Sequence, residues 1–523
     1  MPVDLENLPE SPEELKALFI ETQKEFQAQV KQRDSKIELL SDQLQALKHQ
    51  LYGRRSEKLS PEESRQATLF NEAEEIAAAA KEKTENIKVK SHARKKPGGR
   101  KPLPEDLPRE EIIVDIPEEQ KQCDCGHDLK RIGEDITEKV DIIPAKVVVK
   151  RYVRPKYACS HCKGADADAG SIQQASLPPQ ILPKTRADAG LAAWSLYSKF
   201  NIHLPFYRQA QILKSLGIDI RRDDLSRYAI SIGRMLEEKV LPLMWSDLLQ
   251  SPVIGADETP FKLLIRPGDN KKKVKQVYMH VAYGTGPPMV LFKYQSTRKI
   301  EFMRELLCDY TGVVMSDDFG GYNWLHAPGS KITHANCMAH VRRKFFEASS
   351  IAKSSEATEG LWLMKELYAV EKNARKNNAS PEERLVLRQE RSVPIMRALY
   401  DYLLSSEEKA YPGHPFEKAV TYALKLWPRL QHFLNDGNIP IDNNTVENAI
   451  RPFALGRKNW LFAGAPAGAS ASAAIYSITE SAKLNKHDVY KYLKYLFEEL
   501  PKADTEEKIH KLLPYNLDCS KYE

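Results

Sequence analysis

Residues 441–462 read IDNNTVENAIRPFALGRKNWLF, and the interpretation of the whole 523-residue chain depends on this segment. It opens with Asp442, a favourable helix N-cap residue, and Gly456 ends its periodic pattern. Glu447 lies off the apolar stripe, and Arg451 follows one turn later on the same side. The segment therefore predicts a short helix that presents a carboxylate, although alone it also fits a surface Glu–Arg pair. The apolar residues at helical spacing are Val446, Ala449, Ile450 and Phe453.

Two predicted buried strands upstream each end in an acid, Asp257 and Asp317. The predicted elements are, in order, a strand at 252–257, strands at 274–283 and 288–294, a helix at 298–307 and a strand at 311–317. This is the order of an RNase H-like sheet, whose first and fourth strands are central neighbours and carry two aspartates side by side. Such a sheet needs a third carboxylate from a later helix, and Glu447 is placed to supply it.

The three acids offer only hard oxygen ligands, which suit Mg²⁺ or Mn²⁺. Two such ions about 4 Å apart can activate water or a 3′-hydroxyl and stabilise the leaving oxygen of a phosphoryl displacement. Glu258 and Asp318 compete with their neighbours, but strand alternation lets only one of each adjacent pair face the ions. We choose Asp257 and Asp317 as catalytic residues with Glu447, although each Asp alone also fits a strand-end turn or cap.

The interval between Asp317 and Glu447 is much longer than a minimal core of this kind needs. Residues from about 352 to 436 are charged and helix-like, which indicates a helical insertion rather than a structureless loop. The predicted catalytic domain then spans 250–464, and residues 465–523 form a helical C-terminal segment.

The N-terminal part predicts self-association and a basic arm. Residues 13–59 carry a heptad ladder typical of a coiled coil, so we expect a homodimer or higher oligomer; the alternative is a helix packed on its own protein. Residues 60–110 form a linker with nine Lys or Arg against two Glu between 81 and 101. This arm either enters a DNA groove or is solvated linker. Its candidate DNA contacts are Arg94, Lys95, Lys96, Arg100 and Lys101.

Residues 111–165 predict a small β unit built around a metal. Two cysteine pairs frame strand-like stretches at 139–143 and 145–153. Four thiolates can close a tetrahedral Zn²⁺ site, which would replace the core that this unit lacks. His127 or His161 could substitute for one thiolate, and the alternative is reduced thiols without metal. The predicted ligands are Cys123, Cys125, Cys159 and Cys162.

Residues 187–245 predict a helix-turn-helix region. A helix over 203–217, a turn and a second helix within 218–230 have the spacing of this motif, although ordinary helical hairpins share it. Cations here and beside the three acids can hold DNA phosphates. They are Arg221, Arg222 and Arg227 in this region, and Arg342, Arg343, Lys344, Arg451, Arg457 and Lys458 beside the acids.

Composition narrows the class of protein. With 42% hydrophobic and 29% charged residues the chain should fold and stay soluble, and a net charge of +6 is a mild indication of a polyanionic partner. No apolar run reaches membrane-spanning length, and the acidic N-terminus lacks a signal-peptide core. We therefore expect a cytoplasmic protein without a membrane partner.

A set of specific motifs runs through almost the whole chain. They occupy residues 51–59, 95–104, the two cysteine knuckles, 203–208, 256–259, 316–322, 337–347, 442–447 and 456–464. Together they resemble the transposases of the insertion-sequence-66 family, which are bacterial DDE enzymes. The resemblance maps the second catalytic acid to Asp317. It implies cleavage at transposon ends, transfer of 3′ ends to target DNA and binding of double-stranded terminal repeats. It also implies accessory proteins of the same element and a nucleoid-associated location in a bacterial cytoplasm.

Two features depart from the usual family pattern, and a third suggests another metal. Cys123 and Cys125 are separated by one residue where the family usually has two, and Asp318 replaces a usual Gly. Cys337 and His340 could form a soft-metal pair, but hard catalytic metals favour a structural or DNA-contact role. Two other functions stay open: a DNA-binding regulator or domesticated relative that does not cut, and an RNase H-like nuclease or resolvase acting on branched nucleic acid.

Overall fold

The computed structural model describes residues 147–158, 172–264, 274–350, 354, 356–408, 410 and 412–522, with scattered positions between 11 and 36. The chain divides into two compact units, Ala73–Ala175 and a larger unit of Met1–Glu72 with Ser176–Glu523. Within the described residues, no helix combines the length and the apolar character needed to cross a membrane.

The larger unit is organised around a five-stranded mixed sheet with the order β5-β4-β3-β6-β7. β3 pairs antiparallel with β4, and β4 with β5, whereas β3 pairs parallel with β6, and β6 with β7. The predicted α/β class is confirmed, and the two strands that lead to Asp257 and Asp317 are neighbours. The strands are β3 Val253–Leu264, β4 Val274–Thr285, β5 Pro288–Gln295, β6 Val313–Ser316 and β7 Thr333–Asn336.

β3 is longer than the sequence predicts. The strand does not end at Asp257, because β4 keeps pairing with it as far as Leu264 opposite Val274. Asp257 therefore lies inside a strand, so the strand-end turn considered for it is wrong. The helix predicted at 298–307 is also shorter, Glu301–Leu306 (α8), and β7 has no counterpart among the predicted elements.

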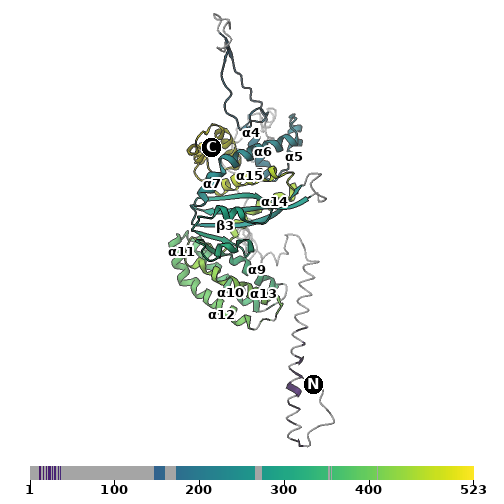
Figure 1. The fold of residues 1–523 in the computed structure, drawn as a ribbon, viewed down its shortest axis with the longest axis vertical. Coiled ribbons are helices and arrows are strands. Elements are labelled where there is room, and N and C mark those ends of the chain that lie inside the picture. Colours follow the sequence, from purple (N-terminus) through teal and green to yellow (C-terminus); the bar gives the residue numbers. More distant parts are fainter. Residues whose placement is uncertain are drawn as a thin grey trace, which may run out of the picture. The chain divides into compact units, whose positions relative to one another are not determined.

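On one face of the sheet α15 and α7 pack against β5, and α6 packs on α15 (Figure 1). Ser477 and Ser481 of α15 accept hydrogen bonds from the backbone N–H groups of Phe292 and Val290 on edge strand β5, at 2.8 and 3.0 Å. These bonds satisfy donors that an edge strand would otherwise leave exposed. The helices outside the insertion, besides α8 and α9, are α4 Ala189–Leu196, α5 Phe206–Ser215, α6 Arg222–Lys239, α7 Leu241–Leu248, α14 Asn444–Trp460, α15 Pro466–Leu484, α16 Val489–Glu499 and α17 Glu506–His510.

The opposite face carries α9 and the helices of the insertion (Figure 1). α9 packs on α10 and α13. Inside this layer the buried Arg388 donates from Nε and Nη2 to the two carboxylate oxygens of Glu371, at 2.7 and 2.8 Å. Its Nη1 donates to the backbone carbonyls of Phe433 and Asp436. The helices are α9 Met338–Ser350, α10 Glu356–Lys376, α11 Pro381–Leu387, α12 Val393–Glu407 and α13 Pro415–Leu430.

A pair of helices, α5 and α6, precedes the sheet in the chain. α5 begins at Phe206 rather than at the predicted residue 203. After it, Gly217 has φ +83°, a left-handed conformation that glycine adopts without strain. α6 then begins at Arg222 and contacts α5. The spacing and contact are those of a helix-turn-helix.

The smaller unit is described only in part. β1, Lys156–Ala158, pairs antiparallel with β2, Ile172–Gln174. The strand predicted at 145–153 is wrong over its described part, because residues 147–153 pair with no strand among the described residues and Val149 is 95% exposed. The four predicted zinc ligands, the five cations of the basic arm and most of the predicted coiled coil lie outside the described residues.

Candidate active site

The pairing of β3 with β6 brings two acids from distant parts of the chain to the same place. The last paired residues are Gly255 of β3 and Met315 of β6. Continuing this parallel pairing by two residues places Asp257 opposite Asp317, on one face of the sheet because alternate residues share a face. Asp317 directly follows β6, and its Oδ1 accepts the backbone N–H of Phe319 at 3.0 Å.

The first turn of α14 lies against β3 and carries the third acid. Gly255 allows this approach, because a Cβ there would lie 2.4 Å from Cγ2 of Val446. Asn443, the residue before the helix, donates from Nδ2 to the backbone carbonyl of Ala256 at 3.0 Å. These contacts hold Glu447, in the first turn, near the segment of β3 that carries Asp257.

Both ends of α14 differ from the sequence prediction. The N-cap residue is Asn443, and Asp442 instead accepts a backbone hydrogen bond at the start of the helix. The helix continues through Gly456 to Trp460. Gly456 is buried at a close contact, since a Cβ there would lie 2.6 Å from the hydroxyl of Tyr476. This glycine therefore serves packing rather than helix termination.

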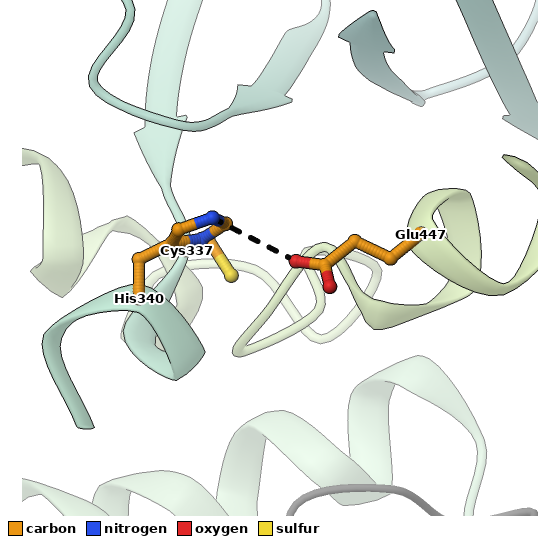
Figure 2. Close-up of side chains that lie close together, drawn as sticks. All are labelled: Cys337, His340 and Glu447. Atoms are coloured by element: carbon orange, nitrogen blue, oxygen red, sulfur yellow. Dashed lines mark ion pairs between the residues drawn. The ribbon is translucent and has the colours of Figure 1, made fainter. Parts of the chain in front are cut away.

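The side chain of Glu447 points toward α9, and its nearest charged partners are on α9 rather than on its own helix, α14. Its Oε1 lies 3.8 Å from Nε2 of His340, and its Oε2 lies 3.5 Å from Nη2 of Arg343. Figure 2 shows the His340 ring and the Glu447 carboxylate pointing toward each other from separate helices. Glu447 and Arg451 are both described and no ion pair joins them, so the alternative of a surface Glu–Arg pair is not observed.

The electrostatics of Asp257 reflect a cluster of acids. The pKa of Asp257 is raised to about 8, chiefly by burial and in smaller part by the negative charges of Glu258, Asp317 and Glu447. The backbone N–H of Glu258, 2.7 Å from Oδ1, opposes the increase. Ionising Asp257 is thus unfavourable without added positive charge, and a divalent cation would supply that charge.

The neighbouring acids, Glu258 and Asp318, already have cationic partners. The Glu258 carboxylate is almost fully buried, lies 2.7 Å from the Arg298 guanidinium and accepts the hydroxyl of Tyr322 at 3.1 Å. Asp318 lies 2.5 Å from Nζ of Lys425 on α13. Because their charges are matched within the protein, both are weaker candidates for metal ligands than Asp257 and Asp317.

A second set of possible ligands also includes Glu447. Among the described residues, Cys337, His340 and Glu447 are the three metal-ligating side chains whose ligand atoms all lie within 4.8 Å of one another. Asp257, Asp317 and Glu447 are not gathered that tightly. A pair of ions bridged by shared carboxylates does not require one common ligand shell.

The family profile described as transposase IS66 family matches residues 184–471, which is more than half of the chain. This chain belongs to the IS66 transposase family. Further profiles match the zinc-finger binding domain of transposase IS66 at 120–163, the transposase C of IS166 homeodomain at 39–112, and the IS66 C-terminal element at 477–515. A transposase role, a zinc-finger region and DNA binding follow from this membership.

Relatives in Sinorhizobium fredii (strain NBRC 101917 / NGR234) match the IS66-family chain over most of its length. Uncharacterized protein y4jD is 32% identical over 90% of this chain and 93% of its own length. Uncharacterized protein y4hP is 31% identical over 85% of this chain and 82% of its own length. Uncharacterized protein y4qI is 28% identical over 99% of each. The similarity thus extends beyond the catalytic region to the flanking segments.

Burial disfavours one of the DNA contacts predicted for this IS66-family protein. Arg342 is only 3% exposed, and its guanidinium lies 5.1 Å from the ring centroid of Tyr368 in the insertion. The Arg342 side chain therefore faces the helical layer, and its contact with DNA stays a prediction. Arg457 is half-buried and donates to Oγ1 of Thr259 at 2.8 Å and to the carbonyl of Pro260. Arg457 therefore ties α14 to β3.

The other described cations remain exposed. The side chains of Arg221, Arg222 and Arg227 are each about two-thirds exposed or more, and they pair with Asp223 or Asp224 at the start of α6. On α9 and α14 the exposed cations are Arg343, Lys344, Arg451 and Lys458.

Sequence reasoning missed residues that act through tertiary contact. Arg298, which neutralises Glu258, and Asn443, which anchors α14 to β3, carry no local signal because their partners lie far away in the chain. The Cys337-x-x-His340 spacing was a usable signal for a ligand pair. The position of Glu447 beside that pair could be learned only from the fold.

Proposed function

We propose that this IS66-family protein is a DDE transposase that binds the terminal repeats of its element, cleaves DNA there and transfers the 3′ ends into target DNA. The observation that carries the proposal is the convergence of three acids. Asp257 lies in β3, Asp317 directly follows the adjacent parallel strand β6, and Glu447 lies on the helix packed against β3. In this proposal the sheet and its helices form an RNase H-like core.

Asp257, Asp317 and Glu447 would hold Mg²⁺ or Mn²⁺, two ions per active site. Such ions activate the attacking oxygen and stabilise the leaving oxygen of a phosphoryl transfer. Two observations support metal binding by these residues. Asp257 is largely buried and has its pKa raised to about 8, and Glu447 Oε1 is buried without a hydrogen-bond partner among the described residues. A cation would match the charge of Asp257 and would satisfy Oε1 of Glu447, since Arg343 is near the other oxygen, Oε2.

Exposed cations would position the DNA. Arg343 lies beside the third acid, and Arg451 and Lys458 are exposed further along α14, where these cations would contact DNA phosphates. The α5–α6 pair would bind the terminal repeat through Arg221, Arg222 and Arg227. The zinc unit, with Zn²⁺ on Cys123, Cys125, Cys159 and Cys162, and the basic arm would extend this contact.

Self-association and accessory proteins belong to the same proposal. Phe19 and Phe26 of the predicted heptad ladder lie on helical backbone and are 65% and 67% exposed. A second copy of the ladder would bury such a seam. Dimerisation would bring two transposon ends together, and accessory proteins of the element would assist.

The test uses purified full-length protein, Mg²⁺ and a labelled duplex that carries the source element's own terminal repeat. We expect cleavage at the repeat boundary by the wild type and none by Glu447→Gln. Both proteins should shift the duplex with similar affinity in a binding assay, because Glu447→Gln leaves the DNA-binding regions intact.

Cleavage by Glu447→Gln at the wild-type rate would refute the role of this carboxylate. Binding without cleavage by the wild type, even with the neighbouring gene products of the element, would replace the proposal with a DNA-binding regulator.

A further inference from the structure

Cys337, His340 and Glu447 converge from two parts of the fold. Cys337 lies between β7 and α9, and His340 lies in the first turn of α9. Glu447 comes from the first turn of α14, and the ligand atoms of the three lie within 4.8 Å of one another. Figure 2 shows the thiol and imidazole side by side, with the carboxylate directed at them. The Cys-x-x-His spacing places both α9-side ligands at one end of the helix.

Two polar atoms in this cluster are buried without hydrogen-bond partners among the described residues. They are Nδ1 of His340 and Oε1 of Glu447. Oε1 lies 3.8 Å from His340 Nε2, too far for a hydrogen bond. Leaving such buried atoms unsatisfied is unfavourable, because each has lost its hydrogen bonds to water. A bound cation between imidazole and carboxylate would satisfy the oxygen directly.

The thiol of Cys337 needs a cation before it can carry a negative charge. Burial, with the charges of Asp442 and Glu447, raises the pKa of this thiol well above its ordinary value. The backbone N–H of Asn443, which the buried Sγ accepts at 3.1 Å, partly opposes that increase and would stabilise a metal-bound thiolate. Asn443 also anchors α14 to β3. The same residue therefore fixes the thiol and the helix that carries Glu447.

The ligand chemistry distinguishes this cluster from the three acids. Thiolate, imidazole and carboxylate together suit Zn²⁺ and its analogue Co²⁺, whereas Mg²⁺ prefers oxygen alone. Ligand atoms of a tetrahedral zinc ion lie roughly 3.3–3.6 Å apart. Small side-chain rotations would bring the present separations to that value. Three protein ligands leave a fourth position open to water.

We propose that Cys337, His340 and Glu447 bind one Zn²⁺, and that this ion withdraws Glu447 from the Mg²⁺ centre and thereby inhibits strand cleavage. Binding releases the thiol proton of Cys337 to solvent, and Zn²⁺ takes its place on the sulfur. The inhibitory half rests on the proposed function, because it needs Glu447 to serve cleavage. The binding half depends on the three side chains alone.

Cobalt titration of full-length protein tests the binding half. The spectrum of thiolate-bound Co²⁺ and the number of ions bound are compared in wild type, Cys337→Ser, His340→Asn and the control Cys308→Ser, which removes an exposed cysteine elsewhere. We expect Cys337→Ser and His340→Asn each to bind about one ion fewer than the control. The zinc unit contributes equally to all four proteins. Equal Co²⁺ uptake by all four would overturn the proposal.

Zinc inhibition tests the second half. Each protein's cleavage rate is normalised to its own rate in Mg²⁺ alone, and Zn²⁺ is then added. Wild type and Cys308→Ser should lose cleavage, and Cys337→Ser should need on the order of 10–100-fold more Zn²⁺ for the same loss. Equal sensitivity of all variants would refute inhibition through this site. If the wild type never cleaves, the proposed function fails, while the cobalt titration still decides the metal site.

Discussion

Two buried carboxylates of the larger unit, Glu371 and Asp257, differ in whether a cationic side chain pairs with them. In the insertion, Glu371 is enclosed with Arg388, which binds both of its oxygens and is itself fully buried. In the sheet, Asp257 accepts a backbone N–H and has three other acids around it, and the described residues give it no ion pair. The insertion balances its own charge, whereas the sheet leaves negative charge for an external cation to match.

This difference separates structural from functional use of a buried acid. A buried ion pair with complete hydrogen bonding is a self-contained packing element, and removing one partner leaves an isolated charge. An acid whose charge is unfavourable in the folded protein is retained where a ligand makes it favourable. We therefore expect the two regions to respond differently to substitution and to metal.

The largest expected effect is on the cleavage rate, and it should distinguish Asp317 from the adjacent Asp318. Asp317→Asn should lower the cleavage rate on the order of 10³-fold, because it removes a metal ligand worth several kcal/mol to the transition state. Asp318→Asn should stay within about 10-fold of wild type, since Asp318 is engaged by Lys425 on α13. Single-turnover cleavage of a terminal-repeat duplex measures both. Equal losses would place Asp318 in the site as well.

The insertion should be the more fragile region in folding. Arg388→Met should lower the free energy of unfolding by about 3–5 kcal/mol, because Glu371 is left buried without a counter-charge. Combining it with Glu371→Leu should recover much of this loss. Urea unfolding followed by circular dichroism gives both values. A loss below about 1 kcal/mol for Arg388→Met would show that water reaches Glu371.

Metal should stabilise the sheet region and not the insertion. At about 100 times its dissociation constant, Mg²⁺ should raise the free energy of unfolding of wild type by about 2.7 kcal/mol. In Asp257→Asn, Mg²⁺ should raise the free energy of unfolding much less than in wild type. In Arg388→Met, Mg²⁺ should raise it as much as in wild type, although the metal-free protein is less stable. Unfolding with Mg²⁺ and with chelator measures the difference. An undiminished Mg²⁺ effect in Asp257→Asn would argue against its role as a ligand.

A buried histidine of the sheet gives a smaller, pH-dependent effect. Burial, followed by the charges of Arg429, His326 and His432, lowers the pKa of His334 to about 3. The unfolded chain then binds more protons than the folded one between about pH 6.5 and 3, so stability falls as pH falls through that window. The slope is at most about 1.4 kcal/mol per pH unit. Urea unfolding of His334→Gln across this window should show a shallower decline; a parallel decline would contradict the assignment.

Much of the layout could be predicted from local patterns. The order of strands, the apolar stripe of α14 with Val446, Ile450 and Phe453, and the acids at matching strand positions all follow from residues close together in the chain. Such patterns report periodicity over one or two turns. They indicated most of the elements of the larger unit, although β7 was not among the predicted strands.

The errors share a physical cause. Gly456 looked like a helix end, but its contact with Tyr476 makes it an interior packing residue. Arg342 looked like a surface cation, but the insertion buries it. Residues 147–153 looked like a strand, but among the described residues they find no partner. In each case the structure depends on contacts with residues that lie far away in the sequence, outside the local pattern.

Local sequence alone was sufficient for the types of most elements, for the candidate acids and for the Cys-x-x-His spacing, because each is carried by residues within a few positions of one another. The tertiary structure decided that Glu447 meets His340 and Arg343 instead of Arg451, and that Asp257 rather than Glu258 remains without a cation. Those choices depend on strand register and on the close approach of α14 at Gly255, where packing between distant segments outweighs the preference of any one segment.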